Sequence, residues 1–303
     1  MMPTFLLIGA MKAGTTALYQ ALDQHPGVFM SPVKEPNFFA FAEDPPSFEA
    51  PLDRSPDGIN HTTIADPAAY EALYDAADSG QARGEASHTT LYWPEGAANV
   101  ARFAPDARLV AMLRNPIERA YSEYMHFVRD GHEPLDSFAA ALDAEAERIE
   151  ANWAFGRYVD RGRYHEQLCR FYDRFPAEQI RVYLFDDFRA DPTATIRDLY
   201  QFIGVDPSVS PEWGRRVNKS GVPQRPWVEQ VLSGLQPIRE ALAPVIPERL
   251  VDWALRLRNQ NLDKPPMSPA VRDRLRETYR PEIRRLEGLL DRDLSHWLAS
   301  AEA

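Results

Sequence analysis

The first residues that could do chemistry lie in a glycine-containing segment near the N-terminus, Ile8-Gly-Ala-Met-Lys-Ala-Gly-Thr-Thr-Ala17. Gly9 and Gly14 flank four residues, as in the GxxxxGK[S/T] loop that holds phosphate in nucleoside triphosphatases. In those enzymes the lysine directly follows the second glycine, whereas here Thr15 takes that position and Lys12 comes earlier. The segment therefore predicts an anion site in which Lys12 could neutralise charge on a bridging oxygen as a bond breaks.

Backbone amides and hydroxyl groups complete this predicted anion site. A glycine loop between a strand and a helix presents successive N–H groups, and the positive end of the helix dipole, to a phosphate. Ala13, Gly14, Thr15 and Thr16 occupy that part of the loop, and both threonines add a hydroxyl donor. We expect these residues, together with Lys12, to bind a phosphorylated ligand.

A second candidate phosphate site lies in the segment Leu-Arg-Asn-Pro-Ile-Glu-Arg-Ala-Tyr-Ser-Glu-Tyr. Arg114 directly follows an apolar run and can form a bidentate charged pair with a phosphate. Ser122 follows eight residues later on a predicted helix, and two helical turns bring it to the same face. The spacing predicts that both residues contact one phosphate group.

Three short apolar runs predict the elements that position these groups. Residues 5–8, 109–113 and 180–185 are continuously apolar or nearly so, and each run is followed by a stretch with helical spacing. Strands of this kind are typical of parallel sheets that are covered on both faces. The predicted fold class is α/β, with three layers as in P-loop proteins and a central parallel sheet flanked by helices.

Helix signals agree with this arrangement. Asn115 can cap a helix that begins at Pro116, where the missing proline amide costs nothing. A second helix is predicted to begin with Asp191 and Pro192 and to end at Gly204. Apolar spacing predicts further helical stretches at about 135–151 and 163–175.

The rest of the chain divides into a predicted loop and a predicted helical part. Residues 41–69 are rich in Pro and Asp and lack periodicity, and a structureless loop of this length is uncommon unless it is functional or disordered. Residues 226–303 belong to a C-terminal region that we expect to be helical. Its predicted breaks are at Pro223, Pro226, Pro265, Pro266 and Pro281.

Composition excludes several classes of protein. The chain has 303 residues, is 44% hydrophobic and carries a net charge of −11, which disfavours binding to nucleic acid. Cys169 is the only cysteine, so no intrachain disulfide can form. No apolar run approaches the roughly 20 residues needed to span a membrane, and the first residues do not read as a signal peptide. We expect a single cytoplasmic domain over residues 1–303.

Taken together, the motifs resemble those of sulfotransferases that use 3′-phosphoadenosine 5′-phosphosulfate (PAPS). The sequence Lys-Ala-Gly-Thr-Thr after a short strand is similar to the 5′-phosphosulfate loop of that family, and the Arg114 to Ser122 segment resembles its 3′-phosphate motif. The resemblance covers most of residues 4–225 and implies a donor-binding core there. It also implies that no metal is needed.

Two further segments of this resemblance supply candidate catalytic residues. Ser-Pro-Val-Lys-Glu-Pro-Asn-Phe-Phe is similar to the Lys-Glu-x-His-Phe-Phe segment of heparan sulfate glucosaminyl sulfotransferases and their bacterial relatives, which implies Glu35 as the catalytic base. Arg-Gly-Glu-Ala-Ser-His matches the family's Gly-Glu-x-Ser/Thr strand end, and His88 lies near the histidine base of the cytosolic small-molecule enzymes. Glu35 and His88 both remain candidates for the base. The predicted acceptor contacts are Lys34, Asn37, which replaces the family's histidine, and Glu85.

The resemblance also implies contacts to the nucleoside of the donor. Phe185 lies where a tyrosine of related enzymes packs near adenine. The segment Arg-Arg-Val-Asn-Lys-Ser-Gly-Val-Pro is similar to a loop that closes over the 3′-phosphate, which implies roles for Asn218, Lys219 and Ser220.

The expected function is transfer of a sulfuryl group from PAPS to a hydroxyl or amine of a small-molecule, lipid or glycan acceptor. Residues 41–69 would help to form the acceptor site, and Trp153 could contact an acceptor ring or pack in the core. Two alternatives stay open. One is a P-loop phosphotransferase in which Asp186 and Asp187 hold a metal. The other is a nucleotide-binding module without turnover.

Overall fold

A five-stranded parallel sheet forms the centre of the computed structural model, which describes residues 1–213, 222–223, 262–263 and 265–299. The strand order is β2-β3-β1-β4-β5. A short antiparallel pair, β6 with β7, lies outside this sheet. The strands are β1 Phe5–Gly9, β2 Val28–Met30, β3 Ala82–Ala86, β4 Arg108–Leu113, β5 Ile180–Leu184, β6 Val222–Pro223 and β7 Leu262–Asp263.

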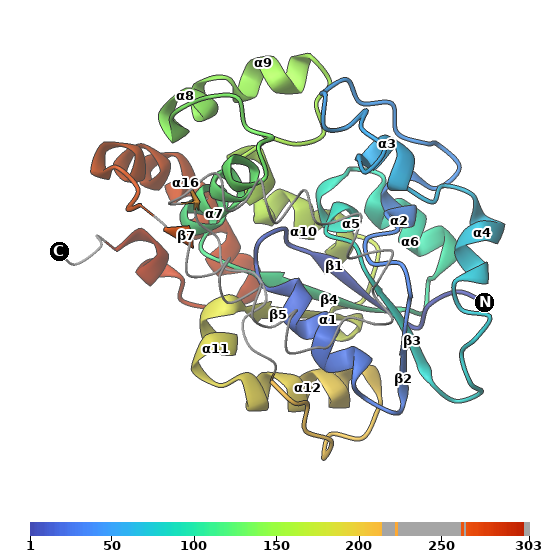
Figure 1. The fold of residues 1–303 in the computed structure, drawn as a ribbon. Coiled ribbons are helices and arrows are strands. Elements are labelled where there is room, and N and C mark those ends of the chain that lie inside the picture. Colours follow the sequence, from blue (N-terminus) through green and yellow to red (C-terminus); the bar gives the residue numbers. More distant parts are fainter. Residues whose placement is uncertain (214–221, 224–261, 264, 300–303) are drawn as a thin grey trace.

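Helices cover both faces of the sheet, which makes three layers (Figure 1). Helices α1 and α12 lie together on one face, where the Tyr200 hydroxyl donates to the Ala21 carbonyl at 2.7 Å, and α5, α6 and α10 lie on the other. The α-helices are α1 Thr15–Asp23, α2 Phe38–Phe41, α3 Ile59–Thr62, α4 Pro67–Ala72, α5 Thr89–Tyr92, α6 Gly96–Phe103, α7 Pro116–Arg129, α8 Phe138–Asp143, α9 Glu145–Glu150, α10 Tyr164–Tyr172, α11 Phe185–Ala190, α12 Pro192–Ile203 and α16 Pro269–Leu290. The 3₁₀ helices are η1 Asp160–Gly162, η2 Ala177–Gln179 and η3 Ser295–Leu298.

The three apolar runs are strands of this sheet, so the predicted α/β class is confirmed. Every residue of β1 is buried, and β4 is buried after its first residue, because both strands have neighbours on each side and helices on each face. Strand β2 was not predicted, since three residues are too few to show a period. Phe185 does not end β5 as the sequence indicated but opens α11.

The predicted helix ends are confirmed by their capping contacts. The Asn115 side chain accepts a hydrogen bond from the Ile117 amide at 3.0 Å, and the Asp191 side chain accepts one from the Ala194 amide at 2.9 Å. Gly204 ends α12 in the left-handed conformation, with φ of 82°.

Three expectations about the elements need correction. The stretch 135–151 forms two short helices, α8 and α9, instead of one. Residues 41–69 are not structureless, because they contain α3 and the start of α4. Pro281 does not break a helix but lies inside α16, on its exposed face, while Leu275, Tyr279, Ile283 and Leu286 bury the opposite face. Packing of that face outweighs the lost proline hydrogen bond.

The strand order reverses beside β1, and this reversal determines where a site can form. From β1 the chain moves to β2 at one edge and returns to β3, and it then crosses to β4 on the other side of β1. The chain therefore leaves β1 toward one side of the sheet and leaves β4 toward the other, and both loops start at the carboxyl edge. In open α/β sheets this is the point at which ligands bind. No helix within the described ranges is long and apolar enough to cross a membrane.

Candidate active site at the carboxyl ends of the strands

All five strands of the sheet end in or near residues that the sequence singled out. Lys12 follows β1, Glu35 follows β2, His88 follows β3, Arg114 follows β4 and Phe185 follows β5. Because the strands are parallel, their carboxyl ends share one edge, and residues far apart in the sequence meet there.

The glycine loop between β1 and α1 is shaped for an anion. Gly14 precedes α1 with φ of 102° and supplies no side chain to cap the helix. The Ala17 amide donates to the Gly14 carbonyl at 3.0 Å, so the amides that a ligand would meet first are those of Thr15 and Thr16. A Cβ atom on Gly14 would lie 3.0 Å from the Phe185 ring. Thr15 and Thr16 are the first two residues of α1, and Ala13 beside them is fully buried. The backbone at Gly14 thus favours glycine for two reasons, its conformation and the approach of Phe185.

Arg114 lies against this loop. Its guanidinium donates to the Lys12 carbonyl at 3.1 Å and is centred 5.0 Å from the Phe185 ring. Tyr164 donates to the Arg114 carbonyl at 3.0 Å, which fixes the backbone at the end of β4. Ser122 is buried two turns along α7, and its contact with a phosphate stays a prediction. The structure therefore brings Lys12, Arg114 and Phe185 together.

The two candidate bases lie side by side. Nε2 of His88 is 3.4 Å from Oε2 of Glu35, and Nζ of Lys34 is 3.1 Å from Oε1. The Glu35 side chain is 36% exposed, so it stays open to a second substrate. His88 is buried, and its Nδ1 has no hydrogen-bond partner within the described part of the chain.

These contacts decide the charge of Glu35. Burial raises the pKa of this carboxyl, but the charge and hydrogen bond of His88, followed by those of Lys34, outweigh it and hold the pKa well below its usual range. These contacts therefore stabilise the ionised form of Glu35 beyond that of an ordinary carboxylate.

Glu85 has the opposite environment although it lies on the neighbouring strand end. Its carboxyl is fully buried and accepts a hydrogen bond from the Ser87 hydroxyl at 2.7 Å. Burial, opposed by this bond and assisted by the charge of Glu35, raises the pKa of Glu85 to about 8. Two carboxyl groups with separated pKa values are typical of sites that move protons.

Asn37 is engaged inside the protein. Its backbone amide donates to the Ser87 hydroxyl at 3.1 Å, and its side-chain oxygen accepts from the Thr89 hydroxyl at 2.7 Å. The side chain is buried and joins the Glu35 segment to the start of α5. Its contact with an acceptor stays a prediction, as do those of Lys34 and Glu85.

The end of α7 adds charged residues that the sequence reasoning missed. Burial first, and then the charge of Arg129, lowers the pKa of Lys12 to about 8, which identifies α7 as a neighbour of the loop. Nη2 of Arg129 is 2.6 Å from Nδ1 of His126, and Arg129 pairs with Asp130 at 2.7 Å. Burial and the Lys12 charge lower the pKa of His126 to about 4. The sequence signal that could have revealed this cluster is the spacing of three and four residues from His126 to Arg129 and Asp130 on a predicted helix.

Other predicted residues fall elsewhere. Asn218, Lys219 and Ser220 lie outside the described residues. Asp186 accepts a hydrogen bond from the Trp297 indole at 2.8 Å, and Asp187 pairs with Arg292 at 2.9 Å, so both carboxylates face the C-terminal part of the chain. Among the described residues, no group of three or more His, Cys, Asp or Glu side chains could hold a metal ion.

Comparison with known proteins agrees with this geometry. The sequence model of the sulfotransferase family matches residues 3–209, which are two thirds of the chain and contain every strand of the central sheet. The chain belongs to the sulfotransferase family. A solved sulfotransferase from Alicyclobacillus acidocaldarius is 33% identical, with a TM-score of 0.76 over 99% of this chain and 100% of that one.

Two human sulfotransferases have a lower sequence identity to this chain. Carbohydrate sulfotransferase 15 of Homo sapiens is 24% identical over 98% of this chain and 54% of its own length. The human bifunctional heparan sulfate N-deacetylase/N-sulfotransferase 2 is 26% identical over 68% of this chain and 22% of its own length. The chain thus spans about half of the first relative and about a fifth of the second.

Proposed function

We propose that this sulfotransferase takes a sulfuryl group from PAPS and transfers it to a hydroxyl or amine of a small-molecule, lipid or glycan acceptor. The observation that carries the proposal is the contact of Arg114 with the Lys12 carbonyl, at the edge of the sheet where Glu35 follows β2. Two cationic groups and a row of helix amides suit a ligand with two separate phosphate groups. PAPS has this shape and supplies the sulfuryl group when it is bound.

Each candidate site residue would have a separate role. The loop from Lys12 to Thr16 holds the 5′-phosphate, and the Lys12 ammonium neutralises the oxygen that is left on it as the bond to sulfur breaks. Arg114 and Ser122 bind the 3′-phosphate. Glu35 accepts the proton of the acceptor, and His88 holds the carboxylate in place at 3.4 Å. The transfer is an in-line displacement at sulfur.

The phosphotransferase alternative loses its support at Asp186 and Asp187. Both carboxylates are paired with groups near the C-terminus, so a bound metal would have to displace Trp297 and Arg292. The lysine of a triphosphate loop is also missing after Gly14. Against a binding module without turnover, the Glu35 carboxylate is 36% exposed and lies 3.4 Å from His88, so an acceptor can reach it.

Calorimetric titration with adenosine 3′,5′-bisphosphate, 5′-AMP and ATP with magnesium tests the donor. We expect strong preference for the bisphosphate, without metal. Arg114→Ala should reduce that affinity by roughly 30-fold to 100-fold, since a charged hydrogen bond is worth about 2–3 kcal/mol. Affinity for 5′-AMP should change much less, and it serves as the internal control.

Preference for ATP with magnesium would instead support a phosphotransferase. Tight bisphosphate binding with no sulfated product from PAPS and a panel of phenols, amines and sugars would support the binding module.

A further inference from the structure

A cavity of about 230 Å³ lies beside the end of α7. Three segments line it: residues 50–52 of the predicted acceptor loop, residues 127–134 and the stretch 148–158. Four aromatic residues, Phe127, Trp153, Phe155 and Tyr158, are among those that line it.

Three polar residues of this cavity, Arg148, Glu133 and Tyr158, are paired with one another. Arg148 donates to both oxygens of Glu133, at 2.6 and 2.8 Å, and the Tyr158 hydroxyl donates to Glu133 at 2.5 Å. Burial raises the pKa of Glu133, but these bonds outweigh it and keep the carboxyl ionised. The charges of Arg148 and Glu133 therefore cancel, and His132 is the other titratable side chain of the lining besides Tyr158.

Several contacts hold the cavity in shape. Gly156 has φ of 78°, and a Cβ atom there would lie 2.7 Å from Nη1 of Arg148. The buried Asp53 accepts a hydrogen bond from the Ala154 amide at 2.8 Å, and Ser47 accepts one from the Asn152 side chain at 3.1 Å. These bonds attach the 41–69 segment to the stretch that carries Trp153.

The cavity adjoins the candidate active site through two of its rings. Phe127 stacks next to His126, with ring centroids 5.8 Å apart. Phe155 lies 5.5 Å from the Arg161 guanidinium, whose distance to the Tyr92 ring is 4.4 Å. Tyr92 ends α5, the helix that begins directly after His88, so Arg161 and Tyr92 lie between the cavity and the segment of this candidate base.

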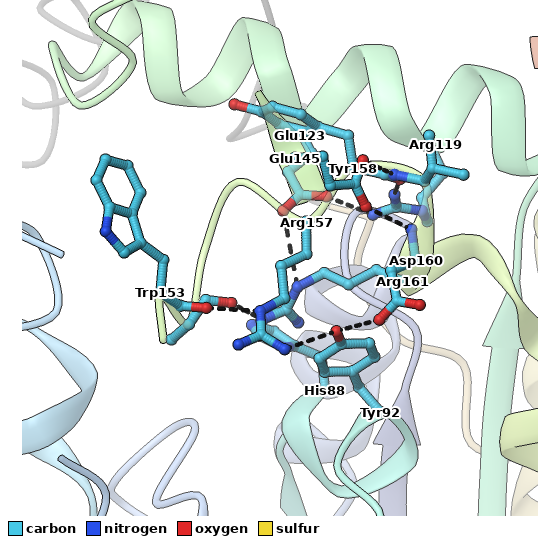
Figure 2. Close-up of polar contacts among 12 residues, drawn as sticks. His88, Tyr92, Arg119, Glu123, Glu145, Trp153, Arg157, Tyr158, Asp160 and Arg161 are labelled. Atoms are coloured by element: carbon cyan, nitrogen blue, oxygen red, sulfur yellow. Dashed lines mark hydrogen bonds and ion pairs between the residues drawn. The ribbon is translucent and has the colours of Figure 1, made fainter. Parts of the chain in front are cut away.

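Figure 2 shows how Trp153 is presented. Its carbonyl accepts a hydrogen bond from Arg157 at 2.5 Å, which fixes the backbone, while the indole ring points away from the network of Tyr92, Asp160 and the arginines. Trp153 is partly exposed, whereas Tyr158 behind it is fully buried. The residue is thus held at its backbone, its ring is partly exposed, and the Arg148 guanidinium lies 5.3 Å from the ring centre.

We propose that this cavity is the acceptor subsite and that it takes an uncharged six-membered ring bearing the hydroxyl to be sulfated. This inference rests on the proposed function. A cavity of about 150 Å³ can hold benzene, so the present volume admits one substituted ring. An aromatic ring and the apolar face of a sugar both stack on tryptophan. A carboxylate or sulfate would find Arg148 already occupied by Glu133.

Binding of ring compounds to the full chain, without nucleotide, tests the inference. Naphthol and methyl glucoside represent aromatic and sugar rings, and a heparin disaccharide represents an anionic glycan. Calorimetry should show binding of at least one neutral ring in preference to the disaccharide. Comparison of the naphthol and methyl glucoside affinities then shows whether the cavity favours an aromatic ring or a sugar ring. Trp153→Ala should lower the affinity for the neutral ring about tenfold, and Trp153→Phe should restore most of that affinity.

Trp213→Ala is the matched control, because Trp213 is 46% exposed and does not line the cavity. It should leave ring binding unchanged, and affinity for adenosine 3′,5′-bisphosphate should be the same in the Trp153 variants as in the wild type. Preference for the heparin disaccharide, or equal ring affinity in wild type and Trp153→Ala, would overturn the inference. Failure of the wild type to bind the bisphosphate would instead refute the proposed donor, and the ring titration would still decide the cavity's ligand.

Discussion

At the scale of single residues, the site separates an ionised carboxylate from a neutral one. Glu35 has its charge stabilised by His88 and Lys34, while the buried Glu85 has its pKa raised to about 8. The sequence left Glu35 and His88 as rival bases. The structure brings them to 3.4 Å and so makes them one unit.

The first residue-scale prediction distinguishes the two members of this unit. Glu35→Gln should lower kcat by roughly a hundredfold or more, since a general base contributes on the order of 10²–10⁴, while donor affinity stays unchanged. His88→Asn should have a smaller effect, because it removes only the group that orients Glu35. Single-turnover assays with calorimetry would check this, and full activity in Glu35→Gln would make His88 the base.

The second residue-scale prediction concerns pH. Burial lowers the pKa of Lys12 to about 8, so the free enzyme loses the ammonium charge as the pH rises through that value. Affinity for adenosine 3′,5′-bisphosphate should be greatest below pH 8 and fall above it by up to tenfold per pH unit. Titration between pH 6 and about pH 10 measures this. Lys12→Arg is the control, since arginine stays charged and should abolish the decline.

At the scale of elements, short loops at the carboxyl ends of parallel strands position the site. The loop after β1 reaches Arg114 after β4 and Phe185 after β5, because these strands are adjacent in the sheet. Helix α7 serves two regions: Ser122 lies in its middle and His126 near its end, beside the proposed acceptor cavity.

The element-scale prediction is made at the turn into α1. Gly14→Ala should destabilise the protein by about 1–2 kcal/mol and weaken bisphosphate binding, because a Cβ at φ of 102° is strained and would lie 3.0 Å from Phe185. Gly131→Ala is a matched control with φ of 74° but no neighbour within 4 Å. Denaturant unfolding and calorimetry on both variants separate backbone strain, which they share, from the clash, which only Gly14→Ala has.

At the scale of the whole molecule, the C-terminal segment supports the donor site. The buried Trp297 donates to Asp186 at the start of α11, and its carbonyl accepts from the Asn115 side chain at 3.1 Å. Asn115 follows Arg114 and Asp186 follows Phe185, so one tryptophan contacts the residues next to two predicted ligands. The cytoplasmic location inferred from the sequence stays a prediction.

The whole-molecule prediction tests this long-range support. Trp297→Ala should destabilise the protein by about 3–5 kcal/mol, as large buried aromatics do, and reduce bisphosphate affinity although Trp297 is not expected to touch the ligand. Trp213→Ala, at an exposed tryptophan, should change stability by less than about 1 kcal/mol. If Trp297→Ala lost stability but kept wild-type affinity under native conditions, the segment would support the fold alone.

The sequence by itself determined the class of fold, the glycine loop and the Arg114 segment, because these depend on local order: apolar runs, a capping Asn115 and fixed spacing along one helix. Only the tertiary structure decided which groups meet. Strand order places Arg114 on the Lys12 carbonyl, contacts with His88 and Lys34 separate the pKa of Glu35 from that of the buried Glu85, and packing of the 41–69 segment against Trp153 creates a cavity. None of these follows from spacing, since each depends on residues that are distant in the chain and share an environment only after folding.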